Sequence, residues 1–221
     1  MNVMTIPYGA TAYGMGNQMI EDAKKSGIPL LMDLEHSWGA YLGRLNYETA
    51  RNCIKNPMRM LEIFEIAGKR ADKQNKYLQW EMPISRFPVI QYYVEGTVKK
   101  TNIRYRGRTL QLNLCYTEDL SFAKGRQSCG VAPNVVHSFD ALHVCLVTNY
   151  APFEVTTVHD SFGSLLGDMD ALYKLVRKTF VEIYETTDMN EFMQQIGVND
   201  LEVPKGTLDL NSIHKSEYAF L

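Results

Sequence analysis

A histidine–aspartate pair stands between two short apolar runs in the segment VHDSFG, where Val158 and Phe162 flank His159 and Asp160. The β-branched and aromatic residues on both sides predict a β-hairpin whose tight connection carries the pair. A carboxylate held at a hairpin tip suits Mg²⁺, which takes hard oxygen ligands and keeps several waters. Phosphoryl transfer by two metal ions would need a second acidic ligand from another strand.

Two explanations of Asp160 stay open on spacing alone, a metal ligand and a turn residue. Aspartate is common in turns because its side chain accepts hydrogen bonds from nearby backbone groups. The internal candidates for a second carboxylate are explained more simply as cap, loop or helix-surface residues; they are Asp33, Asp119 and Asp140. Residue spacing alone therefore favours a structural role for Asp160.

The histidines and the serine of the hairpin give little support to other chemistry. His137, His143 and His159 match no zinc spacing, and a lone histidine on a half-apolar helix is more often a hydrogen-bonded core residue. Ser161 lacks the G-x-S-x-G turn that exposes a nucleophile, and no cysteine stands beside a histidine. A covalent mechanism is not indicated.

The most basic part of the chain lies in IRYRGRTLQLNLCY and just before it, at Lys99–Lys100. Alternation predicts a single strand with Arg104, Arg106 and Arg108 on one face. Such a stripe can neutralise phosphates, so it predicts a nucleic-acid contact, to which Arg126 would add. The alternative is a solvated edge strand protected by its charges.

The elements that position these residues are mainly helical. Periodicity predicts helices at 17–25, at 34–71 with Pro57 as the candidate break, at about 134–150, and after an N-cap at Asp168. Residues 80–116 have β character, and Gly9, Gly14 and Gly16 predict a turn region. His137 and Asp140 are three apart and share a helix face.

Composition is that of a packed protein rather than a disordered one. The 221 residues are 45% hydrophobic, and a net charge of −2 leaves any anionic partner to local patches. Four scattered cysteines without a C-x-x-C pair favour a reducing compartment. The N-terminus lacks a basic leader and no apolar run approaches a membrane span, so neither export nor insertion is expected.

Five segments in colinear order resemble the C-terminal part of the single-subunit RNA polymerases of phages and mitochondria. They are NVMTIPYGATAYGMGNQMIED, WEMPISRFPVIQYY, RQSCGVAPNVVHSFDALH, VHDSFG and PKGTLDLNSIHKSEYAFL. The resemblance covers nearly the whole chain and implies an α+β fragment of a right-hand polymerase, helical with a small antiparallel palm sheet and hairpin. It divides the chain into fingers-like 1–75, β-rich 76–118, palm 119–186 and tail 187–221.

The resemblance also implies roles for single residues. Asp160 matches the second of two palm aspartates that bind Mg²⁺, and His159 matches the neighbour that supports the RNA 3′ end. Tyr8, with Gly9 beside it, matches the tyrosine that helps select ribonucleotides, and His137 matches the histidine on the 2′-hydroxyl side. A 2′-hydroxyl both donates and accepts hydrogen bonds, so a phenol and an imidazole can recognise it. The resemblance further implies two Mg²⁺ ions as cofactors. It also implies a DNA template, ribonucleoside triphosphates and an RNA product as partners.

Some parts of the family pattern are not found. The fingers lysine stands eight residues before the tyrosine in the family, and counting back from Tyr8 passes Met1. The arginine upstream of it, the palm strand with the first aspartate and the promoter-reading region have no match either. Since metals and cations act together on the transferring phosphoryl group, this chain is expected to be inactive alone.

The hypothesis is therefore a split polymerase, whose larger subunit supplies the first aspartate and the Lys/Arg pair to this smaller one. In this respect the chain resembles the smaller subunit of the two-chain polymerases of enquatro-type phages, encoded by a virus and acting in the cytoplasm of the infected bacterium. An accessory transcription factor is a further candidate partner.

Two alternatives remain. One is a non-catalytic regulatory fragment that binds nucleic acid or another polymerase. The other is a DNA polymerase fragment, which would carry His-Asp-Glu in the hairpin, whereas Ser161 follows Asp160 here.

Overall fold

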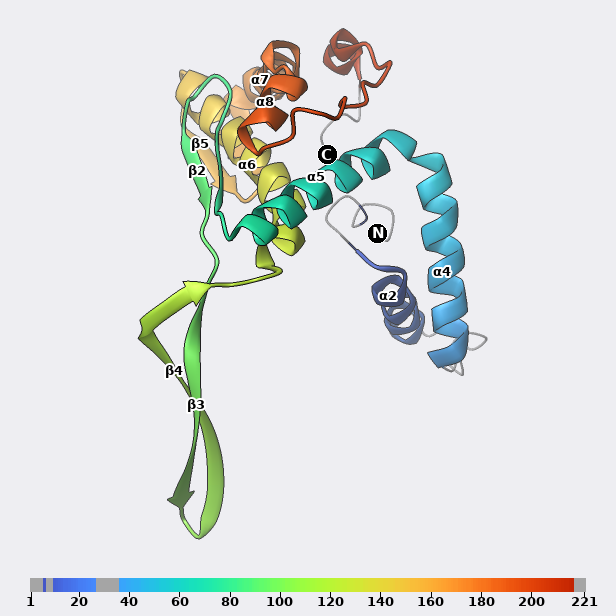
Figure 1. Cartoon of the computed structure of the whole chain (residues 1–221). Coiled ribbons are helices and arrows are strands. Elements are labelled where there is room, and N and C mark those ends of the chain that lie inside the picture. Colours follow the sequence, from blue (N-terminus) through green and yellow to red (C-terminus); the bar gives the residue numbers. More distant parts are fainter. Residues whose placement is uncertain (1–5, 7–9, 27–35, 217–221) are drawn as a thin grey trace.

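The structure is a computed structural model that describes residues 6, 10–26 and 36–216 (Figure 1). Its elements are α2 (Ala12–Lys25), α4 (His36–Cys53), α5 (Lys55–Gln74), β1 (Leu78–Glu81), β2 (Pro88–Gln91), β3 (Val94–Tyr105), β4 (Arg108–Phe122), α6 (Arg126–Tyr150), β5 (Val155–Val158), β6 (Ser161–Ser164), η2 (Leu166–Asp168), α7 (Met169–Thr186), α8 (Met189–Gln195) and η3 (Leu210–Lys215). The described strands form three separate antiparallel pairs, β1–β2, β3–β4 and β5–β6. The predicted α+β class is confirmed.

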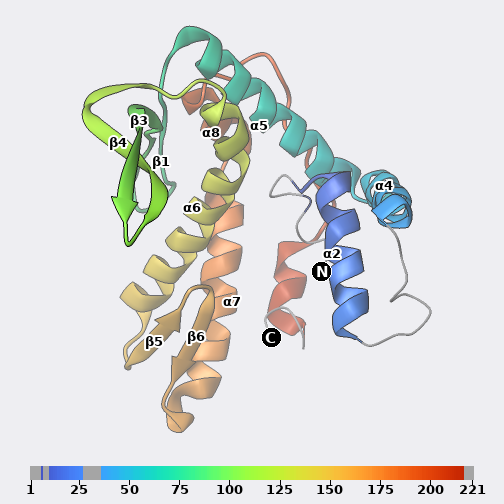
Figure 2. The same cartoon turned by 90° about the horizontal axis from the view of Figure 1, so that it is seen from below.

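The body of the molecule is built on the contact between α5 and α6 (Figures 1 and 2). A Cβ atom at Gly68 would lie 2.3 Å from the Cα of Ser128, so only a glycine lets the two helix backbones come this close. The main core cluster spreads from this contact to β1, α7 and α8, with Ile63, Val131 and Met193 almost fully buried.

The start of α6 corrects the prediction that this helix begins after Pro133. The helix begins at Arg126 and contains Pro133, and its N-cap Gly125 has no side chain to cap it. Asp72 of α5 supplies the cap instead, because its carboxylate accepts hydrogen bonds from the backbone N–H groups of Gly125 at 3.0 Å and Ser128 at 3.1 Å. Such a cap comes from another helix, so no local pattern reveals it.

Two of the glycines predicted to form a turn lie inside α2. This helix begins at Ala12, where the Thr11 hydroxyl accepts a hydrogen bond from the N–H of Gly14 at 3.1 Å. A Cβ at Gly16 would lie 2.4 Å from the carbonyl oxygen of Gly39, so this glycine allows α2 and α4 to pack closely. The prediction was wrong because glycines at a helix contact and glycines in a turn have the same local signature.

The long helical region predicted at 34–71 is present as α4 and α5. The break lies at Ile54, and Pro57 stands in the first turn of α5. Proline is tolerated there because the first N–H groups of a helix have no partner within the helix.

The ribbon of β3 and β4 corrects the prediction of one arginine-bearing strand. Arg106 (φ 48°) and Gly107 (φ 74°) form a two-residue turn, and Tyr105 pairs with Arg108 across it. Both turn residues have positive φ, as in a type I′ hairpin. Arg104 pairs with Thr109, so Arg104 and Arg108 point to opposite faces of the ribbon. The three arginines gather at the ribbon tip but do not form a stripe.

Candidate active site

The hairpin predicted around VHDSFG is confirmed. Strands β5 and β6 pair from Val155 opposite Ser164 to Val158 opposite Ser161, and the two residues between them are His159 and Asp160. Both residues of this turn are exposed. His159 has φ of 56°, a left-handed conformation that non-glycine residues seldom adopt. The turn therefore presents the carboxylate of Asp160 outward at a conformationally restricted position.

One face of the hairpin packs against helices α6 and α7, and this packing fixes the position of the turn. Phe162 and Val155 pack against a small core cluster of Val147 from α6 with Leu172 and Val176 from α7. In Figure 2, α6 and α7 run side by side with β5 and β6 next to them. Burial of these side chains orders the strands, which are too short to be stable as an isolated pair.

His143 of α6 connects the same elements. Its Nε2 lies 2.9 Å from the carbonyl oxygen of Val176 and 3.1 Å from the hydroxyl of Thr179, and its ring meets Phe162 edge-on at 5.4 Å. Burial lowers the pKa of the His143 imidazole below its ordinary 6.5, against the opposing effects of the Val176 carbonyl and the charge of Asp140. This histidine is the core residue that the sequence predicted, and it supports the hairpin.

A pH dependence of stability follows from the lowered pKa of His143. As the pH falls, the unfolded chain is protonated at His143 at a higher pH than the folded chain is. The contribution of neutral His143 to the free energy of unfolding is therefore complete above pH 6.5, and it is lost as the pH falls toward the folded-state pKa. We expect the free energy of unfolding to fall more steeply below that pH in the wild type than in His143→Gln, by at most about 1.4 kcal/mol per pH unit for one proton. Urea unfolding of both proteins across this pH range measures the difference, and parallel pH profiles would contradict it.

His137 and Asp140 lie on the exposed face of α6, near the hairpin. The Nδ1 atom of His137 is 3.6 Å from Oδ2 of Asp140, and both side chains are about half exposed or more. Partial burial raises the pKa of the Asp140 carboxyl; the charge of His137 acts against this rise, and the charge of Asp160 adds to it. The structure therefore brings Asp140 within electrostatic range of Asp160, although its sequence context indicated only a helix-surface residue.

An open cavity of about 520 Å³ adjoins this face of α6. Its apolar walls include Trp80 and Phe87 of the β1–β2 hairpin and its connection, while Asn134, His137 and Ser138 of α6 supply polar groups. The Asn134 amide donates hydrogen bonds at 3.0 Å to the Gln91 side-chain oxygen and to the Tyr93 hydroxyl. His137 thus stands at the edge of a hollow large enough for a planar ligand.

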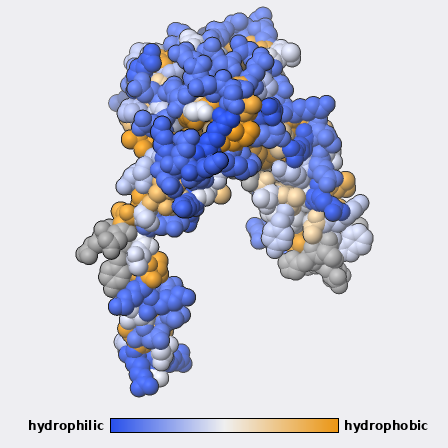
Figure 3. Space-filling model, viewed as in Figure 1, coloured by the Kyte–Doolittle hydropathy of each residue, from blue (hydrophilic) through white to orange (hydrophobic). Residues whose placement is uncertain are grey.

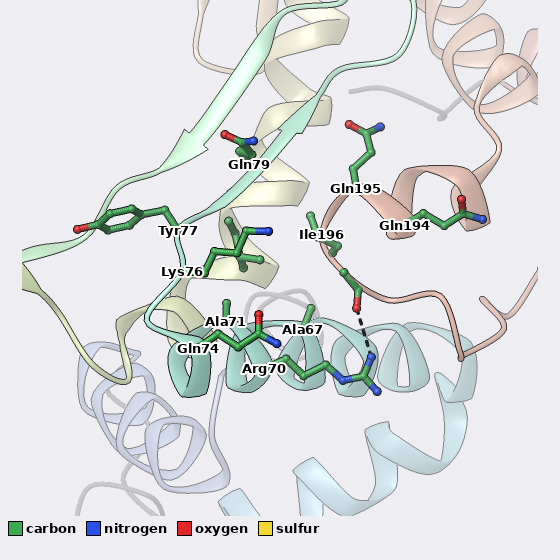
Figure 4. A pocket seen from close by; sticks show the side chains of 12 residues that line it. Ala67, Arg70, Ala71, Gln74, Lys76, Tyr77, Gln79, Gln194, Gln195 and Ile196 are labelled. Atoms are coloured by element: carbon green, nitrogen blue, oxygen red, sulfur yellow. Dashed lines mark hydrogen bonds between the residues drawn. The ribbon is translucent and has the colours of Figure 1, made fainter.

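A second cleft, of about 210 Å³, lies between α5, β1 and α8 (Figure 4). The guanidinium of Arg70 donates to the carbonyl oxygen of Gly197 at 3.3 Å and forms two bonds of 2.7 Å with the Asp200 carboxylate. These bonds join α5 to the segment after α8. None of the predicted site residues lines this cleft, and the bonds of Arg70 connect the segment after α8 to α5.

Among the described residues, the predicted nucleic-acid contacts are not brought together with Asp160. Tyr8 and Gly9 lie outside the described residues. Arg104, Arg106 and Arg108 stand at the tip of a ribbon that projects from the helical body, and Arg126 is exposed at the start of α6 (Figure 1). Among the side chains that the structure describes, no group of three or more His, Cys, Asp or Glu could hold a metal ion. No helix of this described part is long and apolar enough to cross a membrane.

An acidic hairpin tip backed by two helices, in a chain of helices and small antiparallel sheets, is consistent with an α+β fragment of a polymerase. A family model described as DNA-dependent RNA polymerase matches residues 1–199, and the chain belongs to that family. It is 29% identical over 252 aligned residues to T7 RNA polymerase of Escherichia phage T7, with 99% of this chain covered. It is also 26% identical over 227 residues to DNA-directed RNA polymerase 1, mitochondrial, of Arabidopsis thaliana. The chain spans 28% of the phage protein and 23% of the plant protein.

Proposed function

We propose that this chain is a subunit of a DNA-directed RNA polymerase and supplies the second catalytic aspartate for template-directed nucleotidyl transfer. The observation that carries the proposal is the exposed carboxylate of Asp160, held at a hairpin tip on α6 and α7 in a member of this family. The exposed histidine next to it, His159, would support the 3′ end of the RNA.

The residues at the hairpin fit a shared Mg²⁺ site rather than a complete one. Asp160 offers hard carboxylate oxygens with no ion-pair partner among the described residues. Bound Mg²⁺ would activate the attacking hydroxyl and stabilise the charge on the transferring phosphoryl group. The described side chains include no group of three or more such ligands, and we assign the further acidic ligands to other parts of the polymerase.

Selection of ribonucleotides is assigned to His137, together with Tyr8 and Gly9. The imidazole of His137 borders the cavity between the β1–β2 hairpin and α6, where it can exchange hydrogen bonds with a ribose hydroxyl. A polar site of this kind loses a hydrogen bond when the hydroxyl is missing, so it disfavours the deoxy analogue more than an apolar pocket would.

Binding of DNA and RNA is assigned to the basic residues Arg104, Arg106, Arg108 and Arg126. The first three lie at the ribbon tip, where they can neutralise the phosphates of a nucleic acid that extends beyond the helical body of the protein. The four divisions at 1–75, 76–118, 119–186 and 187–221 are part of this proposal, although β4 continues past 118 to Phe122.

The first aspartate and the fingers Lys/Arg pair are assigned to a second, larger polypeptide. The support is that the chain belongs to the DNA-dependent RNA polymerase family, while its described side chains include no group of three or more His, Cys, Asp or Glu that could hold a metal ion. The active enzyme would then be a heterodimer of a virus-encoded polymerase acting in the infected host, with an accessory transcription factor as a further candidate.

The test compares the purified chain alone with the chain combined with the larger polypeptide that carries the remaining polymerase segments. We expect Mg²⁺-dependent RNA synthesis on a single-stranded DNA template from the pair, and a rate at least about 10³-fold lower from either chain alone, because each lacks part of the charge-stabilising machinery. Sedimentation of the mixture checks that a complex has formed. Full RNA synthesis by this chain alone would overturn the heterodimer proposal.

A further inference from the structure

Asp140 lies beside the histidine to which ribonucleotide selection is assigned above. Both residues belong to α6, and Oδ2 of Asp140 is 3.6 Å from Nδ1 of His137. They are three residues apart, which places their side chains on the same face of the helix. This part of α6 is held by the core, because the neighbouring Phe139 and Leu142 are only 7% and 3% exposed. The carboxylate therefore stays close to one particular ring nitrogen of His137.

The position of Asp140 relative to the cavity distinguishes it from an ordinary surface carboxylate. The surface of the helical body is mostly hydrophilic with smaller apolar areas (Figure 3), and an exposed ion pair on it contributes little to stability. His137 lines the cavity of about 520 Å³ together with Asn134 and Ser138, whereas Asp140 is not among the described residues that line it. Asp140 therefore acts on a ligand in this cavity through His137 and not by direct contact.

We propose that Asp140 is a positioning residue that holds His137 in the tautomer with its proton on Nδ1. The Nδ1–H group then points to the carboxylate, and Nε2 is left as a hydrogen-bond acceptor. A ribose 2′-hydroxyl can donate a hydrogen bond to that nitrogen, and a deoxyribose lacks the group. This inference rests on the proposed function of His137, and it adds the residue that determines which hydrogen bond His137 offers.

The rival role for Asp140 is that of a second carboxylate for Mg²⁺ beside Asp160. Partial burial has the largest effect on the pKa of the Asp140 carboxyl and raises it; the charge of His137 lowers this pKa by more than the charge of Asp160 raises it. The ion pair of Asp140 is made with His137. The described side chains also include no group of three or more His, Cys, Asp or Glu that could hold a metal ion. These observations favour the positioning role.

The first experiment measures the tautomer in the full chain without its partner. The ring nitrogen chemical shifts of His137 are recorded by NMR at a pH well above about 6.5, where an ordinary imidazole is neutral. We expect the proton on Nδ1 in the wild type and a transfer of proton occupancy to Nε2 in Asp140→Ala. Alanine favours a helix and the Asp140 side chain is 49% exposed, so the variant should fold. The same tautomer in both proteins would overturn the inference.

The second experiment uses the assembled polymerase and compares kcat/KM for a ribonucleoside triphosphate with kcat/KM for its deoxy analogue. We expect Asp140→Ala to lower this ratio about three- to tenfold, the effect of one hydrogen bond, with the value for the deoxy analogue unchanged. Asp140→Glu keeps a carboxylate and should restore most of the ratio. The matched control is Glu185→Ala, which removes an exposed carboxylate from α7 and should leave the ratio as it is in the wild type.

His137→Ala separates a failure of this inference from a failure of the proposed function. If His137→Ala leaves the ratio unchanged, the proposed role of His137 fails, and the inference is then decided by the tautomer alone. If His137→Ala lowers the ratio and Asp140→Ala does not, the inference is wrong and the proposed function stands. Equal loss of synthesis from both kinds of triphosphate in Asp140→Ala would indicate the metal-binding role, and it too would overturn the inference.

Discussion

Replacing Asp160 by asparagine is expected to reduce RNA synthesis by the assembled polymerase by roughly 10³-fold or more. The amide keeps the shape of the side chain but removes the negative charge that would bind Mg²⁺, and loss of a single charge-stabilising group already costs about 10²–10³ in rate. The substitution is exposed, so the fold should be unchanged. The measurement is the rate of nucleotide addition on a primed single-stranded template at saturating Mg²⁺.

A matched control is available at the other end of the same hairpin. Glu154 is exposed just before β5, and Glu154→Gln removes the same charge without changing the turn. We expect this variant to keep nearly full activity. If Asp160→Asn retained comparable activity, the catalytic proposal would fail and the regulatory fragment would become the better explanation.

Replacing Gly68 by alanine is expected to lower the free energy of unfolding by about 2–3 kcal/mol, which is the cost of overpacking a tight contact. The new Cβ would lie 2.3 Å from the Cα of Ser128 and 2.8 Å from its nitrogen, so the backbones of α5 and α6 must separate. That separation would also lengthen the bonds from Asp72 to the start of α6. Urea unfolding followed by circular dichroism gives the difference.

The control for this variant is Gly167→Ala. A Cβ at Gly167 meets no atom within 4 Å and its φ is not positive, so alanine fits without strain. We expect a change within about 0.5 kcal/mol, or a slight gain from the stiffer unfolded chain. Equal stability of both variants would show that α5 and α6 do not pack as closely as described.

The elements that sequence patterns predicted well are those governed by local rules. The VHDSFG hairpin has short β-branched and aromatic runs around a turn, and both strands and the turn were placed correctly. A break was expected at Pro57 and lies three residues earlier, at Ile54, because proline is accepted in the first turn of a helix. The core character of His143 follows from its apolar neighbours, although its hydrogen bonds to α7 could not be foreseen.

Two of the errors came from contacts between distant segments, and a third came from an unrecognised local turn. The start of α6 depends on Asp72, a residue of another helix, and Gly16 lies in a helix because it faces Gly39. The arginine pattern was misread because Arg106-Gly107 forms a hairpin turn in the middle of an alternating run. Alternation continues through such a two-residue turn, so the period alone does not show that the chain reverses.

The sequence by itself determined the family of this chain and the candidate residues of its site, because the His-Asp pair, the order of the motifs and the basic segment are properties of residue type and spacing. The tertiary structure alone decided how those residues are arranged. It brought Asp140 within electrostatic range of Asp160 and separated Arg104 from Arg108. The reason is physical, since proximity between segments and the solvent exposure of a face result from packing and strand register, which no local pattern encodes.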